Sequence, residues 1–165
     1  MDRIQSIFQG DRLIQDFGMK LLEAREGYAR VSVVVEERFL NAHNIGHGVL
    51  LFAAADAAFA LSVNTAIDAV GVQWSLNVFR AAKPGETVIG ESRIIHAGRQ
   101  SMVCELTVTA GDGRILAKGQ STALPLPRRA SQGTGTIAAT SGGKAAGASK
   151  ARSTTKTKKR RVAKR

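Results

Sequence analysis

One acidic residue lies in the middle of a long apolar segment. Residues 49–63 read V-L-L-F-A-A-A-D-A-A-F-A-L-S-V, and Asp56 is the only ionisable side chain among them. The alanine content favours a helix that is apolar on all sides. Such a helix has to be covered by other elements, and an unpaired carboxylate on it is costly to bury. Asp56 therefore either has a compensating partner or carries a perturbed ionisation that serves a function.

Strand-like segments surround this helix, which we expect over residues 49–64. Alternating or β-branched apolar residues between turn signals predict strands at 19–24, 28–35, 70–79, 87–96, 101–110 and 114–124. Short gaps between several of them predict antiparallel hairpins. A weaker helical pattern, interrupted by Gly10, covers residues 4–17. An antiparallel sheet curled around one apolar helix would bury that helix, so the sequence predicts an α+β domain.

The charge pattern divides the chain into two parts. Residues 1–127 contain 12 Lys/Arg and 13 Asp/Glu, whereas residues 128–165 contain the other 12 Lys/Arg and no acid. The formal net charge of +11 therefore comes from the last segment. We expect a folded domain over 1–127 and a basic, disordered tail over 128–165, which has too little apolar surface to fold. The tail either contacts polyanions such as nucleic acid, polyphosphate or anionic lipid nonspecifically, or only aids solubility.

Other features of the composition narrow the possible classes. The first residues contain an early acid and no apolar core, so we expect no secretory signal. The apolar helix is shorter than the ~20 residues that cross a bilayer. Cys104 is the single cysteine, so the chain forms no internal disulfide. Three scattered histidines do not have the spacing of a metal site. We therefore expect a cytoplasmic protein without a transmembrane segment or a bound metal.

The start of the predicted helix adds a second chemical group. Gly48 precedes the apolar run, where backbone N–H groups are unpaired and the helix dipole favours negative charge. That arrangement can stabilise an oxyanion, and Asp56 can act as a base or nucleophile. The two residues are eight positions apart, about 12 Å along a helix axis. One helix cannot bring both to the same carbonyl, so the spacing favours a homodimer, or a dimer of dimers, with composite sites.

The pattern Asn41-x5-His47-Gly48-x7-Asp56 resembles that of the hotdog-fold acyl-CoA thioesterases. The nearest group is the PaaI-like, phenylacetate-degradation branch of the 4-hydroxybenzoyl-CoA thioesterase superfamily. The resemblance covers roughly residues 12–124, including Lys83-Pro-Gly-Glu86. It implies a hotdog fold, an antiparallel sheet wrapped around one long helix. It also implies hydrolysis of acyl-CoA or aroyl-CoA to the free acid and CoA, with no metal or organic cofactor.

The same resemblance assigns roles to four residues. Asp56 matches the catalytic carboxylate of the family, and Gly48 matches the glycine whose N–H polarises the thioester carbonyl. Asn41 matches an asparagine that helps to place the water or the substrate carbonyl. His47 matches a motif histidine that shapes the same loop. These four residues are the predicted catalytic set.

Further residues are predicted to contact the substrate. Gly98 and Arg99 lie at positions where such proteins often contact CoA, and an arginine side chain is suited to bind a phosphate group. Asn64 either hydrogen-bonds near the substrate or ends the helix. Two positions depart from the family pattern, since Val49 replaces the second glycine of His-Gly-Gly and Asn44 replaces an earlier glycine. We expect Val49 to narrow the acyl pocket or to alter the helix start.

Two other functions stay open at this level. The segment Gly48-Val49-Leu50 resembles part of the hotdog acyl-carrier-protein dehydratases, which suggests an enoyl or 3-hydroxyacyl thioester dehydratase or hydratase. Those dehydratases use a histidine together with an acid, and that acid lies closer to the glycine of the segment than Asp56 lies to Gly48. A non-catalytic acyl-CoA-binding protein is the second alternative. Hydrolysis of acyl-CoA or aroyl-CoA is the function that the pattern favours.

Overall fold

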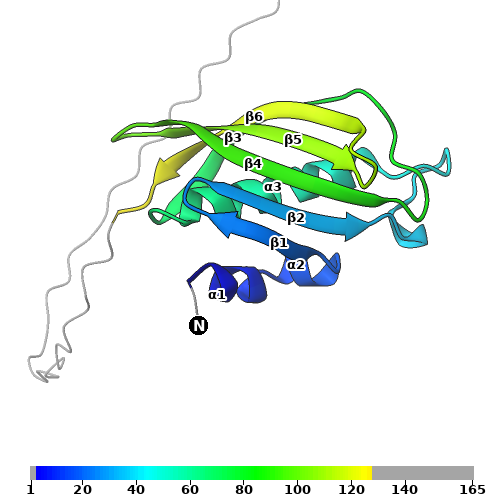
Figure 1. Cartoon of the computed structure of the whole chain (residues 1–165), viewed down its shortest axis with the longest axis horizontal. Coiled ribbons are helices and arrows are strands. Elements are labelled where there is room, and N and C mark those ends of the chain that lie inside the picture. The colour runs from blue at the N-terminus through cyan, green and yellow to red at the C-terminus, as the bar shows by residue number, and fades with distance from the viewer. Residues whose placement is uncertain (1–2, 128–165) are drawn as a thin grey trace, which may run out of the picture. The chain divides into compact units, whose positions relative to one another are not determined.

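A computed structural model describes residues 3–127 as a six-stranded antiparallel sheet with one long helix along one face (Figure 1). The strand order is β1-β2-β4-β5-β6-β3. The strands are β1 (Lys20–Arg25), β2 (Tyr28–Val34), β3 (Ala69–Val78), β4 (Thr87–Ala97), β5 (Met102–Ala110) and β6 (Ile115–Pro125). The helices are α1 (Arg3–Gly10), α2 (Arg12–Asp16), the 3-10 helix η1 (Glu37–Phe39) and the long helix α3 (Gly48–Asn64). The predicted basic tail at 128–165 lies outside the described residues.

The predicted elements agree closely with the structure. All six predicted strands and the long helix are present, with ends that differ by at most one residue. The N-terminal pattern is two helices rather than one, because Asp11 begins a new helix by accepting a hydrogen bond from the Ile14 N–H at 3.2 Å. The 3-10 helix η1 was not predicted. The α+β architecture inferred from the apolar helix is confirmed.

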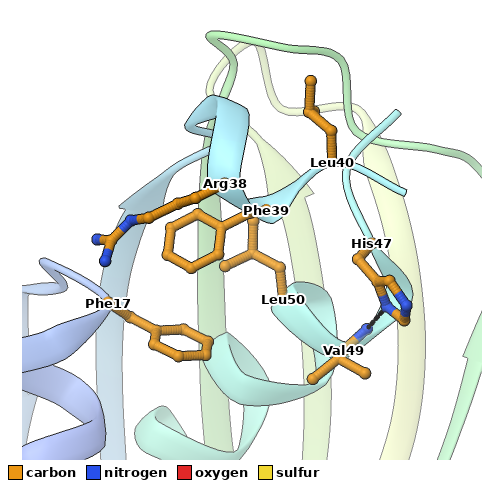
Figure 2. Close-up of a pocket in the computed structure, with 7 residues that line it drawn as sticks. All are labelled: Phe17, Arg38, Phe39, Leu40, His47, Val49 and Leu50. Atoms are coloured by element: carbon orange, nitrogen blue, oxygen red, sulfur yellow. Dashed lines mark hydrogen bonds between the residues drawn. The ribbon is translucent and has the colours of Figure 1, made fainter. Parts of the chain in front are cut away.

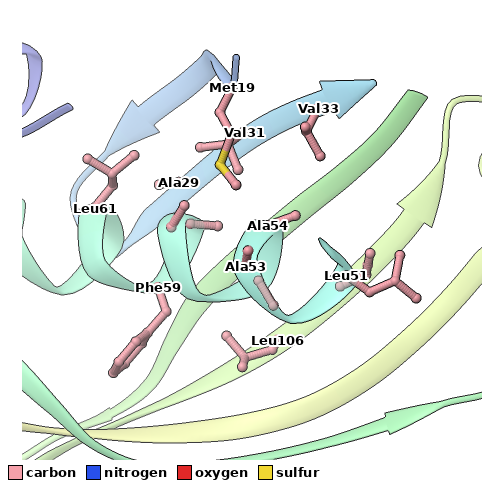
Figure 3. Close-up of a cluster of buried hydrophobic side chains, with 14 of the residues drawn as sticks. Met19, Ala29, Val31, Val33, Leu51, Ala53, Ala54, Phe59, Leu61 and Leu106 are labelled. Atoms are coloured by element: carbon pink, nitrogen blue, oxygen red, sulfur yellow. The ribbon is translucent and has the colours of Figure 1, made fainter. Parts of the chain in front are cut away.

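Helix α3 forms the centre of the core, as its sequence requires. Eleven of its 17 residues are buried. Figure 3 shows Ala53, Ala54 and Leu61 of α3 beside the apolar side chains of β2. The helix also lies directly on β4, where a Cβ atom added at Gly90 would be 2.1 Å from the carbonyl oxygen of Ala54. Only glycine fits at this crossing, so Gly90 sets how closely the helix approaches the sheet.

Strand β3 is one edge of the sheet and is unusually apolar for an edge. Val70, Val72 and Val78 are each about half exposed, and Phe79, which follows the strand, is 57% exposed. An exposed apolar edge strand is a common place for strand pairing with another copy. Association through this edge stays a prediction. No helix within residues 3–127 has the length and apolar character needed to cross a membrane.

Candidate active site

The start of α3 presents a free backbone donor. His47 is the N-cap residue, and its Nδ1 accepts a hydrogen bond from the Val49 N–H at 3.1 Å. Because Nδ1 is the acceptor, the neutral ring carries its proton on Nε2. The Gly48 N–H takes part in none of the hydrogen bonds found among residues 3–127, and a Cβ added at Gly48 would have nothing within 4 Å. The helix start therefore offers an N–H group with open space around it.

The loop before α3 is held by Asn41. Its Oδ1 accepts hydrogen bonds from the N–H groups of His43 at 2.8 Å and Ile45 at 3.5 Å. Its Nδ2 makes no hydrogen bond within the described part of the chain and is available as a donor. Asn44 has a φ of 57°, the left-handed region in which asparagine is the most acceptable residue after glycine. Asparagine therefore suits the left-handed backbone that this loop has at position 44.

A pocket of about 300 Å³ brings Asn41 and Gly48 together. Its wall also includes Leu51 of α3 and Val78 and Phe79 at the end of β3. The N-terminus of α3 opens on this pocket, so both the helix dipole and the Gly48 N–H favour a group with negative charge there. Two of the four predicted catalytic residues are therefore neighbours within one chain.

A second pocket, of about 260 Å³, also adjoins the helix start (Figure 2). It is lined by Phe17, Arg38, Phe39, Leu40, His47, Val49 and Leu50. The Val49 side chain is 57% exposed and is one of the residues that line this pocket. The departure from His-Gly-Gly therefore changes the wall of a pocket, and it leaves the helix start intact.

Asp56 lies further along α3, and it lines neither of these two pockets. Its carboxylate is half-buried, and Oδ1 accepts a hydrogen bond from Nε1 of Trp74 at 2.7 Å. Burial raises the pKa of Asp56 above its ordinary value, the Trp74 hydrogen bond lowers this pKa, and the Asp11 carboxylate raises it. Among residues 3–127, the carboxylate thus has one hydrogen-bond partner, which is neutral, and its pKa is raised.

Trp74 is the residue of this site to which the sequence pattern assigned no role. The ring does pack, with its centroid 6.0 Å from that of Phe59 and 6.3 Å from that of Phe52. Its indole N–H nevertheless points to the carboxylate. The signal was present in the sequence, because a buried acid on an apolar helix needs a donor, and a tryptophan on an adjacent strand supplies one.

The remaining predicted residues lie away from the helix start. Asn64 ends α3: its Nδ2 donates to the carbonyls of Ala60 at 2.9 Å and Ala69 at 3.1 Å, and its Oδ1 accepts from the Ala69 N–H. These bonds favour the helix-ending role over a contact with substrate. Gly98 and Arg99 form the β4–β5 turn and line a separate pocket of about 320 Å³. Ser92 in β4 hydrogen-bonds Ser62, which lies near the C-terminal end of α3. The β4–β5 turn comes after Ser92, so Arg99 lies beyond that end of the helix and is far from Gly48 of the same chain.

Comparison with known proteins matches the same part of the chain. The model of the thioesterase superfamily matches residues 43–117, a range that includes His47, Gly48, Asp56 and Trp74. The "Putative esterase" of Archaeoglobus fulgidus is 31% identical over 117 residues, covering 70% of this chain and 76% of the relative.

Two further relatives connect the chain with solved structures. The acyl-coenzyme A thioesterase PaaI of Escherichia coli is 28% identical over 104 residues, which cover 62% of this chain and 74% of that protein. Its structure has a TM-score of 0.72 over 74% of this chain and 90% of that one, at 24% identity, and shows a shared fold. A hypothetical thioesterase of Streptococcus pneumoniae, solved with coenzyme A, is 25% identical with a TM-score of 0.69, covering 76% of this chain and 99% of that one.

These matches cover most of the described residues and confirm the predicted hotdog fold. The Archaeoglobus relative is 31% identical over 76% of its own length, and the match to the family model includes the helix start and the half-buried Asp56. We conclude that this chain belongs to the thioesterase superfamily, in its hotdog-fold, PaaI-like group, and is a thioester hydrolase.

Proposed function

We propose that this protein hydrolyses acyl-CoA or aroyl-CoA thioesters to the free acid and CoA, with Asp56 as the general base or nucleophile. The observation that carries the proposal is the half-buried Asp56 carboxylate on the apolar helix of a thioesterase fold. A base works best when its pKa lies closer to the operating pH, and burial moves the pKa of Asp56 in that direction. The reaction needs no metal or organic cofactor.

The Gly48 N–H is the proposed donor to the thioester carbonyl. It is unpaired among the described residues, it lies at the positive end of α3, and it opens on a pocket. A donor in such a place stabilises the negative charge that develops on the carbonyl oxygen. The free Nδ2 of Asn41 lines the same pocket and is suited to hold the water or the carbonyl. His47 contributes by capping the helix, which fixes the Gly48 N–H in place.

The chemistry follows from these groups. In the general-base route, Asp56 accepts a proton from a water molecule, whose oxygen attacks the thioester carbon. The tetrahedral oxyanion is held by the Gly48 N–H, and the C–S bond then breaks. The CoA thiolate leaves and takes a proton, and the acyl group departs as a carboxylate. In the nucleophilic route, Asp56 attacks the carbon directly, and water hydrolyses the resulting anhydride.

Both groups act on one carbonyl only if they come from two chains. Gly48 and Asp56 are eight residues apart on a continuous helix, about 12 Å along its axis. We therefore propose a site in which Gly48 of one copy faces Asp56 of another. The exposed apolar edge of β3 and the half-exposed Phe52 and Val49 on α3 supply a surface for such a homodimer.

We assign binding of the CoA part of the substrate to the β4–β5 turn. The reasons are the charge of this turn and the similarity of the chain to the Streptococcus protein that was solved with coenzyme A. Arg99 in the β4–β5 turn is exposed and lines a pocket, so it is free to bind a phosphate. Gly98 allows the turn to approach a ligand closely. These residues lie far from Gly48 in their own chain, so they fit a site that is completed by a second copy.

The test is a panel of acyl-CoA and aroyl-CoA esters with release of free thiol as the readout. We expect hydrolysis of at least one ester class, and near-complete loss of turnover in Asp56→Asn with the fold retained. Loss of enoyl-CoA absorbance without thiol release would instead identify a hydratase. Binding of acyl-CoA with neither reaction would identify a non-catalytic acyl-CoA-binding protein.

A further inference from the structure

Trp74 supplies the one hydrogen bond that Asp56 receives in the described chain. Its Nε1 donates to Oδ1 at 2.7 Å, whereas Oδ2 has no partner among residues 3–127. The bond joins the central helix to the edge strand, since Asp56 is on α3 and Trp74 is on β3. One carboxylate oxygen is therefore fixed and the other is left open.

The local structure is built to admit the indole ring. A Cβ added at Gly71 would be 2.3 Å from the Trp74 ring and 2.7 Å from the Phe59 ring, so any larger residue at position 71 would displace the indole. The register of β3 with β6 shifts between Gly71 and Gln73, which places a bulge directly before Trp74. Glycine and bulge together aim a bulky side chain from the strand toward the helix.

The ring is also held on both sides along α3. Phe59 meets it edge-on at 82°, and Phe52 lies tilted against it at 54°. These two residues flank Asp56 on the same helix, three residues after it and four residues before it. Packing on both sides removes rotational freedom from the indole and so fixes the direction of its N–H.

We propose that Trp74 is a positioning residue for hydrolysis, which holds Asp56 by Oδ1 so that Oδ2 faces the reacting water or the thioester carbon. The inference rests on the proposed function of Asp56. An indole N–H is a donor only, so it keeps this contact without competing for the proton that the base accepts. A fixed carboxylate reacts faster than a mobile one because its orientation is already set.

The bond also affects the ionisation of the base. A donor to the carboxylate favours its charged form and lowers the pKa of Asp56, against the effect of burial. Asp11, at the start of α2, is the charged group that acts on Asp56 within the described residues, and it raises the same pKa. Removing the indole N–H and removing the Asp11 charge therefore shift the pKa of Asp56 in opposite directions.

The variant that tests the proposal is Trp74→Phe, which keeps an aromatic ring and removes the N–H. We expect kcat to fall roughly tenfold with KM little changed, and the acidic limb of the kcat profile to move to higher pH, because the hydrogen bond that lowers the pKa of Asp56 is lost. Asp11→Asn keeps a capping side chain for α2 and should move the limb to lower pH. Phe59→Leu keeps the donor but loosens the packing that directs it, so it should move kcat and the limb in the same direction as Trp74→Phe, by a smaller amount.

The chain itself provides an independent readout, because Trp74 is its only tryptophan. We expect the emission of the wild-type protein to titrate with the midpoint of the acidic limb, and this transition to disappear in Asp56→Asn. A wild-type profile in Trp74→Phe, in a protein that cleaves thioesters, would overturn the positioning role alone. If the wild-type protein cleaves no thioester, the proposed function fails and the positioning role fails with it. The fluorescence titration would then report only on the hydrogen bond between Trp74 and Asp56.

Discussion

Gly48 and Asp56 lie on the same unbroken helix, the first at its start and the second in its ninth position. Their separation of about 12 Å exceeds the reach of any single carbonyl group. The Gly48 N–H opens on a pocket that Asp56 does not line. A site that uses both groups therefore needs two copies of the chain, which leads to a prediction about mixed proteins.

Mixing two inactive variants should restore activity. Asp56→Asn lacks the base and Gly48→Pro lacks the N–H donor, so each alone is expected to be nearly inactive. After subunit exchange, a mixed dimer contains one intact site and one doubly damaged site. Thiol release should recover to about a quarter of the wild-type rate in an equal mixture. No recovery, with exchange demonstrated by differently labelled copies, would contradict the two-chain site.

Gly48→Pro should remove the donor and leave the fold intact. Proline is favoured at the first helical position, and His47 already has the extended backbone that precedes a proline, with φ −63° and ψ 138°. We expect kcat to fall roughly 100-fold or more with an unchanged melting temperature. Gly48→Ala is the matched control, because it adds a Cβ into open space and keeps the N–H. Equal losses in both variants would assign the effect to the side chain instead of the donor.

The fold was largely predictable because its main signals are local. An all-apolar helix has to be covered, and segments such as 70–79 and 101–110 have the composition and turns of strands. The break near Gly10 was visible, but the capping of a second helix by Asp11 was not inferred from it. The 3-10 helix η1 spans only three residues, which is too short for a recognisable hydrophobic periodicity, so it was not predicted.

The candidate site was less predictable because it depends on contacts between distant segments. Spacing alone gave the separation of Gly48 and Asp56. The bond between Trp74 and Asp56 joins residues 18 positions apart and depends on the missing side chain of Gly71 and a bulge in β3. The position of Arg99 beyond the far end of α3 likewise follows from sheet register, which the sequence pattern did not give. The amide of Asn64, by contrast, is satisfied locally, by Ala60 four residues before it and Ala69 five residues after it.

Asp56→Asn should make the protein more stable at neutral pH. Burial raises the pKa of Asp56 in the folded state, so the ionised carboxylate destabilises the fold at any pH above that pKa. Asparagine removes this cost and keeps an acceptor for Trp74. We expect the melting temperature at pH ~7 to rise by a few degrees. The gain should shrink as the pH falls through the folded pKa and vanish below the unfolded pKa; a lower melting temperature at neutral pH would show the carboxylate to be net stabilising.

Position 44 should accept glycine but not a β-branched residue. Asn44 has a φ of 57°, and a left-handed backbone costs a residue such as valine about 1–2 kcal/mol. Asn44→Gly should preserve both stability and hydrolysis, whereas Asn44→Val should lower the free energy of unfolding by that amount in denaturant titrations. Ala42→Val, in an exposed position of the same loop with ordinary φ, is the control. If both valine variants unfold alike, the left-handed backbone is not the cause.

Val49→Gly should change which acyl groups are accepted while the helix start persists. The cap bond runs from the backbone N–H of residue 49 to His47, so it does not need the valine side chain. The side chain is 57% exposed and forms part of the pocket beside Phe17 and Phe39. We expect kcat/KM to rise for bulky acyl-CoA esters relative to short ones, by roughly 10-fold for each well-placed methylene or ring contact that fits the enlarged pocket. A parallel change for all esters would place Val49 outside the acyl pocket, with its influence limited to the helix start.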